Sequence, residues 1–422
     1  MHLIVYSSLL TPRIKYIFNF IFKEILKVEV EFTGNSQYFL QSEHMKISYA
    51  EAPLGDELFF KSTSLLFSNK VEPIKIKTVP FGEGLAPFPV EQSALSFDVF
   101  AASFFMLSRY EEYLFKDKSE ADFKAKDSLQ VKWRWLKRPI IDEWALILKN
   151  IIQKKYPAFK FQSKTFSHQP TINFTLKPEA PEGFLRKSQF LIGSFFNKEQ
   201  KLVSTLFDDL TGLGVDQEAV LSGLNQIIKK NQPIYFVNFP KDVRNKFRYQ
   251  KASALMANKQ VGLLSPCGPD KEKPAQLKNN LTKLKYIQSS NINLISQQID
   301  NLKLPTCYLY LLGAGVSYDY SMGYSDHPGF RAGTCTPFNW YDLQLEKVTP
   351  IIVMSYCVSD AALLYNRPAE AINTIKEYID SVKMVAGHFY SSWQLKTLSQ
   401  NARYLKWMDV FKEMLKYSGS GS

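Results

Sequence analysis

The sequence predicts an α/β protein of two domains, and three observations support this prediction. The chain has 422 residues, which is too long for one small core at roughly 100–200 residues per domain. Hydrophobic residues make up 45% and aromatic residues 14% of the chain, so it can bury a large core and does not have the composition of a disordered protein. Strand patterns and helix patterns alternate after residue 170, which favours an α/β arrangement.

The first part of the chain combines short strands with longer helices. Apolar residues at period two predict strands at residues 2–6, 28–32, 45–49, 58–60 and 74–79. Helices are predicted from Tyr16 onward and at residues 97–114 and 139–155. The last of these begins at a proline and has two acids in its first turn, where they complement the helix dipole. The Pro/Gly-rich segment 79–91 is predicted to be a loop.

A domain boundary is predicted within residues 159–170, which separates an N-terminal α/β domain (1–165) from a second domain (166–417). Strands of the second domain are predicted at 171–176, 233–239, 261–264, 294–297, 316–317, 351–357 and 388–392. Its helices are predicted at 217–230, 250–258, 274–289, 305–312, 368–385 and 400–417. Six or seven such units in about 250 residues suit a small barrel of parallel strands. The final SGSGS, residues 418–422, is interpreted as the remnant of a tag linker.

Composition also limits the partners and the compartment. A net charge of +12 is compatible with nucleic acid, an anionic membrane surface or an acidic glycan, but does not specify a function. The four cysteines form no CxxC pair, which argues against a zinc site and a disulfide framework. No apolar run reaches the roughly 18–20 residues of a membrane span, and no signal peptide is recognised. We therefore expect a cytoplasmic protein, with association to a membrane surface left open.

Residues 318–338, YDYSMGYSDHPGFRAGTCTPF, form the densest cluster of special-purpose residues in the chain. Glycine tolerates positive φ and close backbone approach, and proline fixes φ. The three glycines and two prolines here therefore predict an ordered, tightly turned loop. Functional sites are often built on ordered loops. Two interpretations stay open, a ligand site and a structural loop that closes the fold.

Four stretches carry a resemblance to a known family. They read TPRIKYIFNFIFKEIL (11–26), FAASFFMLSRYEEYL (100–114), KRPIIDEWALIL (137–148) and DYSMGYSDHPGFRAGTCTPF (319–338). Through them the chain resembles the Bacteroidota-type polysaccharide deacetylases, in which an N-terminal accessory domain precedes a NodB-homology domain. The resemblance implies a distorted (β/α) barrel of about seven strands, fused to a smaller N-terminal α/β accessory domain.

The resemblance also implies a metal-dependent chemistry whose residues this chain lacks. In the family, an Asp and two His hold a divalent metal, a second Asp is the general base and a late His is the general acid. The two Asp positions fall on Asn173 and Thr175, the two metal-binding His positions on Leu264 and Ile299, and the late His on Gln394. None of these side chains binds a metal tightly or transfers a proton. The sequence therefore predicts no catalytic residue, no metal and no cofactor.

The residues that are retained suggest a binding surface. Arg331 matches the family's arginine that orients the base, and its partner here is expected to be Asn173. Aromatic rings in a groove suit stacking against sugar faces, and aromatic residues at strand ends equally often form core. The candidates for ligand contact are Arg331, Tyr324, Asp326, His327, Trp340 and Trp393, with Tyr318 and Tyr320 in the same groove.

Three functional hypotheses follow. The leading hypothesis is a non-catalytic deacetylase-like protein that binds a glycan or a partner protein in a cell-envelope process. The second is an active deacetylase with a rebuilt site of Asp208, Asp209, Asp326 and His327, although the default interpretation of LFDDLTG is a loop or helix-end acid pair. In the third, a basic cluster binds nucleic acid or an anionic membrane surface, unless it is simply a solvated face. That cluster consists of Lys229, Lys230, Lys241, Arg244, Lys246, Arg248 and Lys251.

Overall fold

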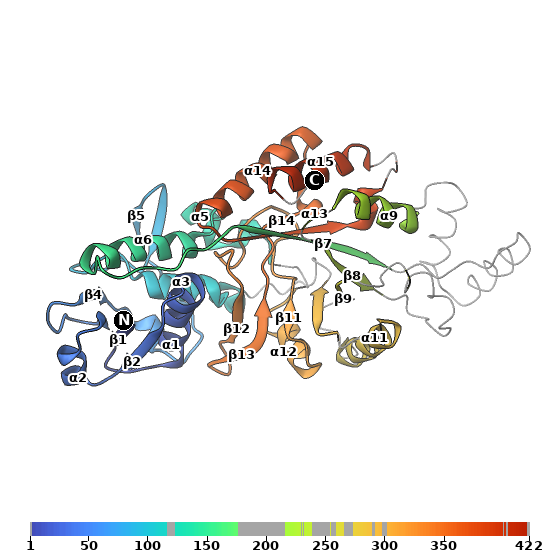
Figure 1. The fold of residues 1–422 in the computed structure, drawn as a ribbon. Helices are drawn as coiled ribbons and strands as arrows, with labels where there is room; N and C mark the ends of the chain where they lie inside the picture. The colour runs from blue at the N-terminus through green and yellow to red at the C-terminus, as the bar shows by residue number, and fades with distance from the viewer. Residues whose placement is uncertain are drawn as a thin grey trace, which may run out of the picture.

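The computed structural model arranges the chain around two largely parallel sheets (Figure 1). It describes residues 2–115, 123–175, 216–228, 230, 232–238, 254, 259–265, 273–288, 292–297, 302–399, 401 and 404–419. Within these ranges, no helix has the length and apolar character needed to cross a membrane. Most of the predicted helix at 250–258 lies outside the described residues.

The N-terminal part is built on a four-stranded parallel sheet. In sheet order its strands are β2 (Val30–Thr33), β1 (Leu3–Tyr6), β3 (Met45–Ala50) and β4 (Leu58–Lys61). Four predicted strands are thus confirmed to within two residues. The fifth strand, predicted at 74–79, instead begins at Thr78, as β5 (Thr78–Phe81). The loop predicted at 79–91 is wrong over much of its length, because β5 forms an antiparallel hairpin there with β6 (Gly84–Pro87).

The helices of this part cover the sheet and differ from the prediction in two ways. They are α1 (Pro12–Asn19), continued by the π-helical η1 (Phe20–Ile25), α2 (Ser36–Gln41), η2 (Ser64–Phe67), α3 (Val99–Leu107), α4 (Tyr110–Leu114), η3 (Ala125–Asp127), α5 (Leu129–Trp133) and α6 (Ile140–Lys155). The short helices α2, η2, η3 and α5 are not predicted. The single helix predicted at 97–114 is divided into α3 and α4. The division occurs at Arg109, whose backbone is left-handed with a φ of 54°.

The second part is built on a nine-stranded sheet. In sheet order its strands are β12 (Phe338–Asp342), β13 (Lys347–Val353), β11 (Tyr318–Asp319), β10 (Leu294–Gln297), β9 (Val261–Ser265), β8 (Ile234–Asn238), β7 (Ser167–Thr175), β15 (His388–Gln394) and β14 (Val358–Ser359). All neighbours from β13 to β14 pair in parallel, and β12 pairs antiparallel with β13. The hairpin of β12 and β13 is not predicted, since only a strand at 351–357 is expected there.

The sheet curves around a small apolar interior. Tyr320, directly after β11, and Tyr390 on β15 have four strands between them in the sheet, yet their ring centroids are 6.1 Å apart. The segment 354–357 joins β13 to β14 across the open side. Its backbone donates from Tyr356 to the carbonyl of Met322 (3.0 Å) and from Cys357 to the carbonyl of Tyr390 (3.3 Å).

These single hydrogen bonds do not make a ladder, and the end strands β12 and β14 do not pair with each other in the described residues. The predicted barrel is therefore not confirmed, and the observed architecture is a curved sheet with two free ends.

Helices lie against the outside of the curved sheet. They are α9 (Gln217–Ile227), α11 (Lys273–Gln288), α12 (Thr306–Gly313), α13 (Asp360–Leu363), α14 (Pro368–Met384), the short η6 (Leu395–Leu398) and α15 (Trp407–Tyr417). Figure 1 shows α14 and α15, which pack on each other, beside the long strands β7 and β15. A single hydrophobic core cluster extends from β1 to α15 and includes residues of both sheets. The two parts are consequently packed together and share one core.

The cysteines differ from the prediction of four thiols. Cys335 and Cys357 are free and buried. Cys307, in the first turn of α12, is disulfide-bonded, whereas Cys267 lies outside the described residues. The prediction fails for Cys307 because the spacing of cysteines in a sequence does not reveal pairing between distant positions.

Candidate functional site

The positions at which the resemblance implies catalytic residues lie at the carboxyl end of the curved sheet. Asn173 and Thr175 end β7, Leu264 lies near the end of β9 and Gln394 ends β15. Asn173 is the register partner of Gln394, and Leu264 belongs to the apolar interior. Ile299 lies outside the described residues. Carboxyl ends of parallel strands are where α/β folds usually build sites, so this is the first candidate site.

The side chains of Asn173 and Ser392 at this edge are neutral. The Asn173 amide nitrogen donates to the Ser392 hydroxyl at 2.9 Å, and the residue is 7% exposed. The Asn173 Oδ1 has no hydrogen-bond partner in the part of the chain that the structure describes. A carboxamide cannot act as a base, and this oxygen is buried.

One carboxylate near this edge was missed by sequence reasoning. Asp360 follows β14 and is 1% exposed. Burial raises its pKa, while the backbone N–H groups of Gln394 and Ala361, each 2.8 Å away, counteract that rise. Both carboxylate oxygens are thus used to begin α13 and to fix the end of β15. We assign Asp360 a structural role.

The residues at this edge do not fit the metal that the resemblance implies. The expected Asp ligand is replaced by an amide or a hydroxyl (Asn173 or Thr175), and one expected His ligand is replaced by the aliphatic Leu264. Over the described ranges, no group of three or more His, Cys, Asp and Glu residues is arranged to hold a metal ion. Asp208 and Asp209 of the rebuilt-site hypothesis lie outside these ranges.

The loop at 318–338 is organised around Arg331, which does not face Asn173. Its Nε donates to Oε1 of Glu112 at 2.9 Å, and one terminal nitrogen donates to Oε2 at 2.6 Å. The other terminal nitrogen donates to the Gly323 carbonyl at 2.8 Å. Gly323 is required there because a Cβ would lie 2.1 Å from Cζ of Tyr356. The expected pairing with Asn173 is therefore replaced by a buried bidentate ion pair with α4.

Arg109 completes this ion-pair network. Its Nε donates to Oε1 of Glu112 at 2.7 Å, and a terminal nitrogen contacts Glu111 at 3.0 Å. The Arg109, Glu112 and Arg331 side chains are all at most 3% exposed. Burial alone would raise the pKa of Glu112, but Arg331 and Arg109 outweigh it and lower that pKa. Glu112 is therefore an ionised carboxylate between two guanidinium groups.

The other stretches of the resemblance meet the same region. Asp142 of α6 accepts hydrogen bonds from the hydroxyls of Thr334 (2.6 Å) and Thr336 (2.5 Å). Arg13 of α1, which is fully buried, donates from Nε to Glu346 at the β12–β13 turn at 2.9 Å. Each of the four resembling stretches thus contributes to the junction between the N-terminal part and the curved sheet.

The remaining sequence candidates are distributed between the core and the surface. Tyr324 is 2% exposed beside Arg109, and Trp340 (1%) and Trp393 (0%) pack in the core against Tyr308 and Phe411 respectively. Because these rings are buried, they do not form the expected groove.

The two polar candidates of the loop lie closer to the surface. Asp326 accepts from the backbone of Ala125 at 3.2 Å, and His327 is exposed, with Nδ1 2.6 Å from the Pro328 carbonyl. Of the basic cluster, the described member is Lys230, which is exposed.

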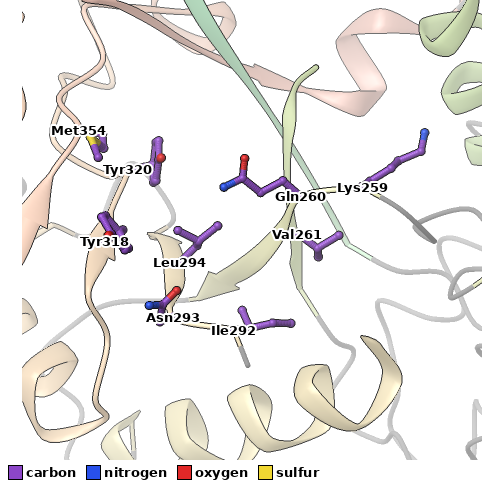
Figure 2. Close-up of a pocket in the computed structure, with 9 residues that line it drawn as sticks. All are labelled: Lys259, Gln260, Val261, Ile292, Asn293, Leu294, Tyr318, Tyr320 and Met354. Atoms are coloured by element: carbon purple, nitrogen blue, oxygen red, sulfur yellow. The ribbon is translucent and has the colours of Figure 1, made fainter. Parts of the chain in front are cut away.

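A pocket of about 420 Å³ opens at the opposite, amino end of β9, β10 and β11 (Figure 2). We call it the amino-edge pocket. It contains Tyr318 and Tyr320, two residues of the predicted aromatic groove. Its lining residues are Lys259, Gln260, Val261, Ile292, Asn293, Leu294, Tyr318, Tyr320 and Met354.

The side chains of the amino-edge pocket are mostly neutral. Figure 2 shows Gln260 pointing toward the Tyr320 side of the pocket and Lys259 pointing away. The Lys259 ammonium is 2.5 Å from Oδ1 of Asn225 and 4.9 Å from the ring centre of Tyr235. Burial raises the pKa of Tyr320 to about 12, so its phenol is a neutral donor at physiological pH.

Comparison with solved structures finds polysaccharide deacetylases among the similar chains. A protein assigned as a polysaccharide deacetylase from Pseudomonas aeruginosa PAO1 is 12% identical, with a TM-score of 0.39 over 61% of this chain and 86% of that one. One similarly assigned from Mycobacterium smegmatis is 12% identical, with a TM-score of 0.37 over 60% and 84%. An allantoinase is 9% identical, with a TM-score of 0.36 over 61% and 85%. No curated protein matches the chain.

A family model matches the N-terminal part of the chain. Residues 3–157 match a model described as a family of unknown function, DUF7033. The match begins at β1 and ends two residues after α6, so it contains three of the four resembling stretches and both Arg109 and Glu112.

Proposed function

We propose that this protein is a non-hydrolytic relative of polysaccharide deacetylases that binds a glycan in a cell-envelope process. The observation that carries the proposal is the hydrogen bond from the Asn173 amide to the Ser392 hydroxyl. Asn173 occupies a position where the resemblance implies an Asp, and its neutral amide is already bonded to a neighbouring side chain. A site of amides and hydroxyls suits hydrogen bonding to sugar hydroxyls, but has no group that takes a proton at neutral pH.

Two further features support a role in the envelope. The four stretches resemble those of a family that is named for polysaccharide deacetylation. The disulfide at Cys307 supports an oxidising compartment, because disulfides are rare in reducing cytoplasm. On this argument we favour a location outside the cytoplasm over the cytoplasmic location expected from the sequence.

The proposal is tested with the purified full chain by three measurements. We expect no stoichiometric zinc or other transition metal by mass spectrometry, and acetate release from N- and O-acetylated polysaccharides at the rate of a no-protein blank. We also expect retention on at least one envelope glycan, such as peptidoglycan or an acetylated polysaccharide, in affinity electrophoresis. Stoichiometric metal together with acetate release would overturn the non-hydrolytic part, and absence of retention on all of these glycans would overturn the binding part.

A matched pair of variants locates the binding surface. Asn173→Ala removes the amide at the carboxyl edge, and Asn366→Ala removes an exposed amide between α13 and α14. If the carboxyl edge contacts the glycan, the first variant weakens retention and the second leaves it unchanged. Thermal unfolding of both variants establishes that the comparison is made on folded protein.

A further inference from the structure

The amino-edge pocket is a concave site at the amino ends of β9, β10 and β11, and Tyr320 and Met354, which follow β11 and β13, also line it. It lies where β9, β10 and β11 begin, whereas Asn173 and Gln394 lie where their strands end. Its volume of about 420 Å³ is at the small end of the range of about 300–1,000 Å³ for small-molecule sites. Such a volume suits a single ring system with substituents more than an extended polymer.

Unpaired polar groups face this space. The side-chain amides of Gln260 and Asn293 and the hydroxyls of Tyr318 and Tyr320 line the pocket. None of these four groups has a hydrogen bond recorded within the described part of the chain. Amides and phenols both donate and accept, so the pocket offers neutral hydrogen-bonding groups of both kinds around one small volume.

The walls between these groups are apolar. Leu294 and Met354 line the pocket beside the two tyrosine rings. The Tyr320 ring is held by Phe236, 5.3 Å away between centroids, and by Tyr390 at 6.1 Å. Tyr320 is 7% exposed, so its ring is fixed by this packing and loses no rotamer freedom when a ligand binds.

The charge pattern limits the ligand class. The one charged residue among the nine lining residues is Lys259, and its ammonium is directed away to Asn225. A charged ligand would therefore lose solvation without gaining a counter-ion. A purely apolar ligand would leave the amides and hydroxyls desolvated and unpaired. An uncharged sugar ring meets both requirements, because it has apolar C–H faces and hydroxyl groups at its edge.

We propose that the amino-edge pocket binds one uncharged sugar residue, with its hydroxyls bonded to Gln260, Asn293 and the two phenols and its C–H groups against the apolar walls. This inference rests on the proposed function for the ligand class, but it assigns a site at the end of the sheet away from the positions implied by the resemblance. The pocket would recognise a chain end or a single unit of the glycan.

Saturation-transfer NMR and calorimetry on the full chain test the inference. The probes are glucose, galactose and N-acetylglucosamine, with glucuronate and glucosamine as charged analogues. The variants are Gln260→Ala and Tyr320→Phe, each of which removes one hydrogen-bonding group without a large change of packing. Gln153→Ala, at an exposed position on α6, is the matched control, and Gln394→Ala samples the carboxyl edge.

We expect at least one uncharged sugar to bind, and each pocket variant to weaken it about 3- to 10-fold, the loss of one neutral hydrogen bond. The charged analogues should bind more weakly, and Gln153→Ala should be unchanged. Binding that is lost in Gln394→Ala but kept in both pocket variants would place the sugar at the carboxyl edge and overturn the inference. The inference fails if no uncharged sugar binds, if the charged analogues bind better, or if both pocket variants bind as tightly as the wild type.

Retention on polysaccharide separates this inference from the proposed function. If polysaccharide is retained but no single sugar binds, or both pocket variants bind single sugars as tightly as the wild type, glycan binding stands and the pocket assignment is wrong. If single sugars bind the pocket but no polysaccharide is retained, the pocket assignment stands and the proposed envelope function is wrong.

Discussion

Arg331 and Glu112 form a buried, bidentate ion pair that joins the loop after β11 to α4, with N–O distances of 2.9 and 2.6 Å. Arg109 shares the same carboxylate. This ion pair gives the retained loop at 318–338 a structural role. The arginine that the resemblance assigns to a catalytic carboxylate here stabilises the junction between the two parts of the chain. Its retention therefore needs no active site to explain it.

Neutralising Glu112 should destabilise the whole protein. In Glu112→Gln the side chain keeps its shape, but two buried guanidinium groups lose their counter-charge. Breaking a buried pair in this way costs about 3–5 kcal/mol in free energy of unfolding. Glu24→Gln is the control, since the exposed Glu24 is 4.0 Å from Lys27 and such pairs are worth about 1 kcal/mol or less. Urea denaturation measures both, and a loss below about 1 kcal/mol for Glu112→Gln would contradict the junction role.

The free energy of unfolding should depend on pH through the titration of Asp319. This carboxyl is fully buried, and burial raises its pKa to about 6 despite hydrogen bonds from Ser321 and Tyr308. The folded state then binds a proton more tightly than the unfolded state, so stability falls as pH rises from about 4 to about 6. The contribution lost is about 2–3 kcal/mol.

Comparison of wild type with Asp319→Asn isolates this contribution. The amide keeps the shape and most of the hydrogen bonds but does not titrate in this range. The difference in unfolding free energy, wild type minus variant, should decrease between pH 4 and pH 7. A difference that stays constant or increases with pH would show that Asp319 is already ionised at pH 4 in the folded protein.

Local patterns predicted most strands and helices, because burial and periodicity are properties of contiguous residues. Asn173, Leu264 and Gln394 are accordingly found at or near strand ends, as predicted. The partner of Arg331 could not be predicted in this way, since Glu112 lies 219 positions away in the sequence. The two free ends of the sheet were also beyond prediction, because pairing of β12 with β14 would join segments that are distant in the sequence.

The sequence also could not predict which aromatic candidates are buried and which line a pocket. Four of these candidates look alike in the sequence, because each is an aromatic residue in or near a strand. They are Tyr318, Tyr320, Trp340 and Trp393. The structure places the two tyrosines in the amino-edge pocket and the two tryptophans in the core. Which face of a short strand points inward depends on the neighbouring strands, so the sequence alone could not separate ligand contact from packing.

The cysteines should react in a fixed order. Burial raises the pKa values of Cys335 and Cys357, so neither thiol should be alkylated by iodoacetamide in the native state. Unfolding without reductant should expose both to alkylation, while Cys307 becomes reactive only after reduction. Peptide mass spectrometry of protein exported to an oxidising compartment measures all three. Alkylation of Cys307 in unfolded, unreduced protein would remove the support for an oxidising compartment.

The contacts of Ser418 make it possible to test whether residues 418–422 are an inert linker remnant. His168 is buried, and its Nδ1 and Nε2 lie 2.8 Å from the Ser418 hydroxyl and 3.1 Å from the Ser391 hydroxyl. Ser418 donates to the Leu415 carbonyl at 3.0 Å, so it accepts the hydrogen bond from Nδ1. Burial lowers the pKa of His168 to about 3, which keeps the imidazole neutral in the fold.

Truncation after Tyr417 should leave Nδ1 of His168 without a partner and reduce the free energy of unfolding by about 1–3 kcal/mol, the cost of an unsatisfied buried donor. Truncation after Gly419 is the matched control and should change nothing, because Ser418 is kept. Both are compared near pH 7.5, since protonation of His168 in the unfolded chain lowers stability as pH falls below about 6.5. Equal stability of the two truncations would show that Ser418 belongs to the linker after all.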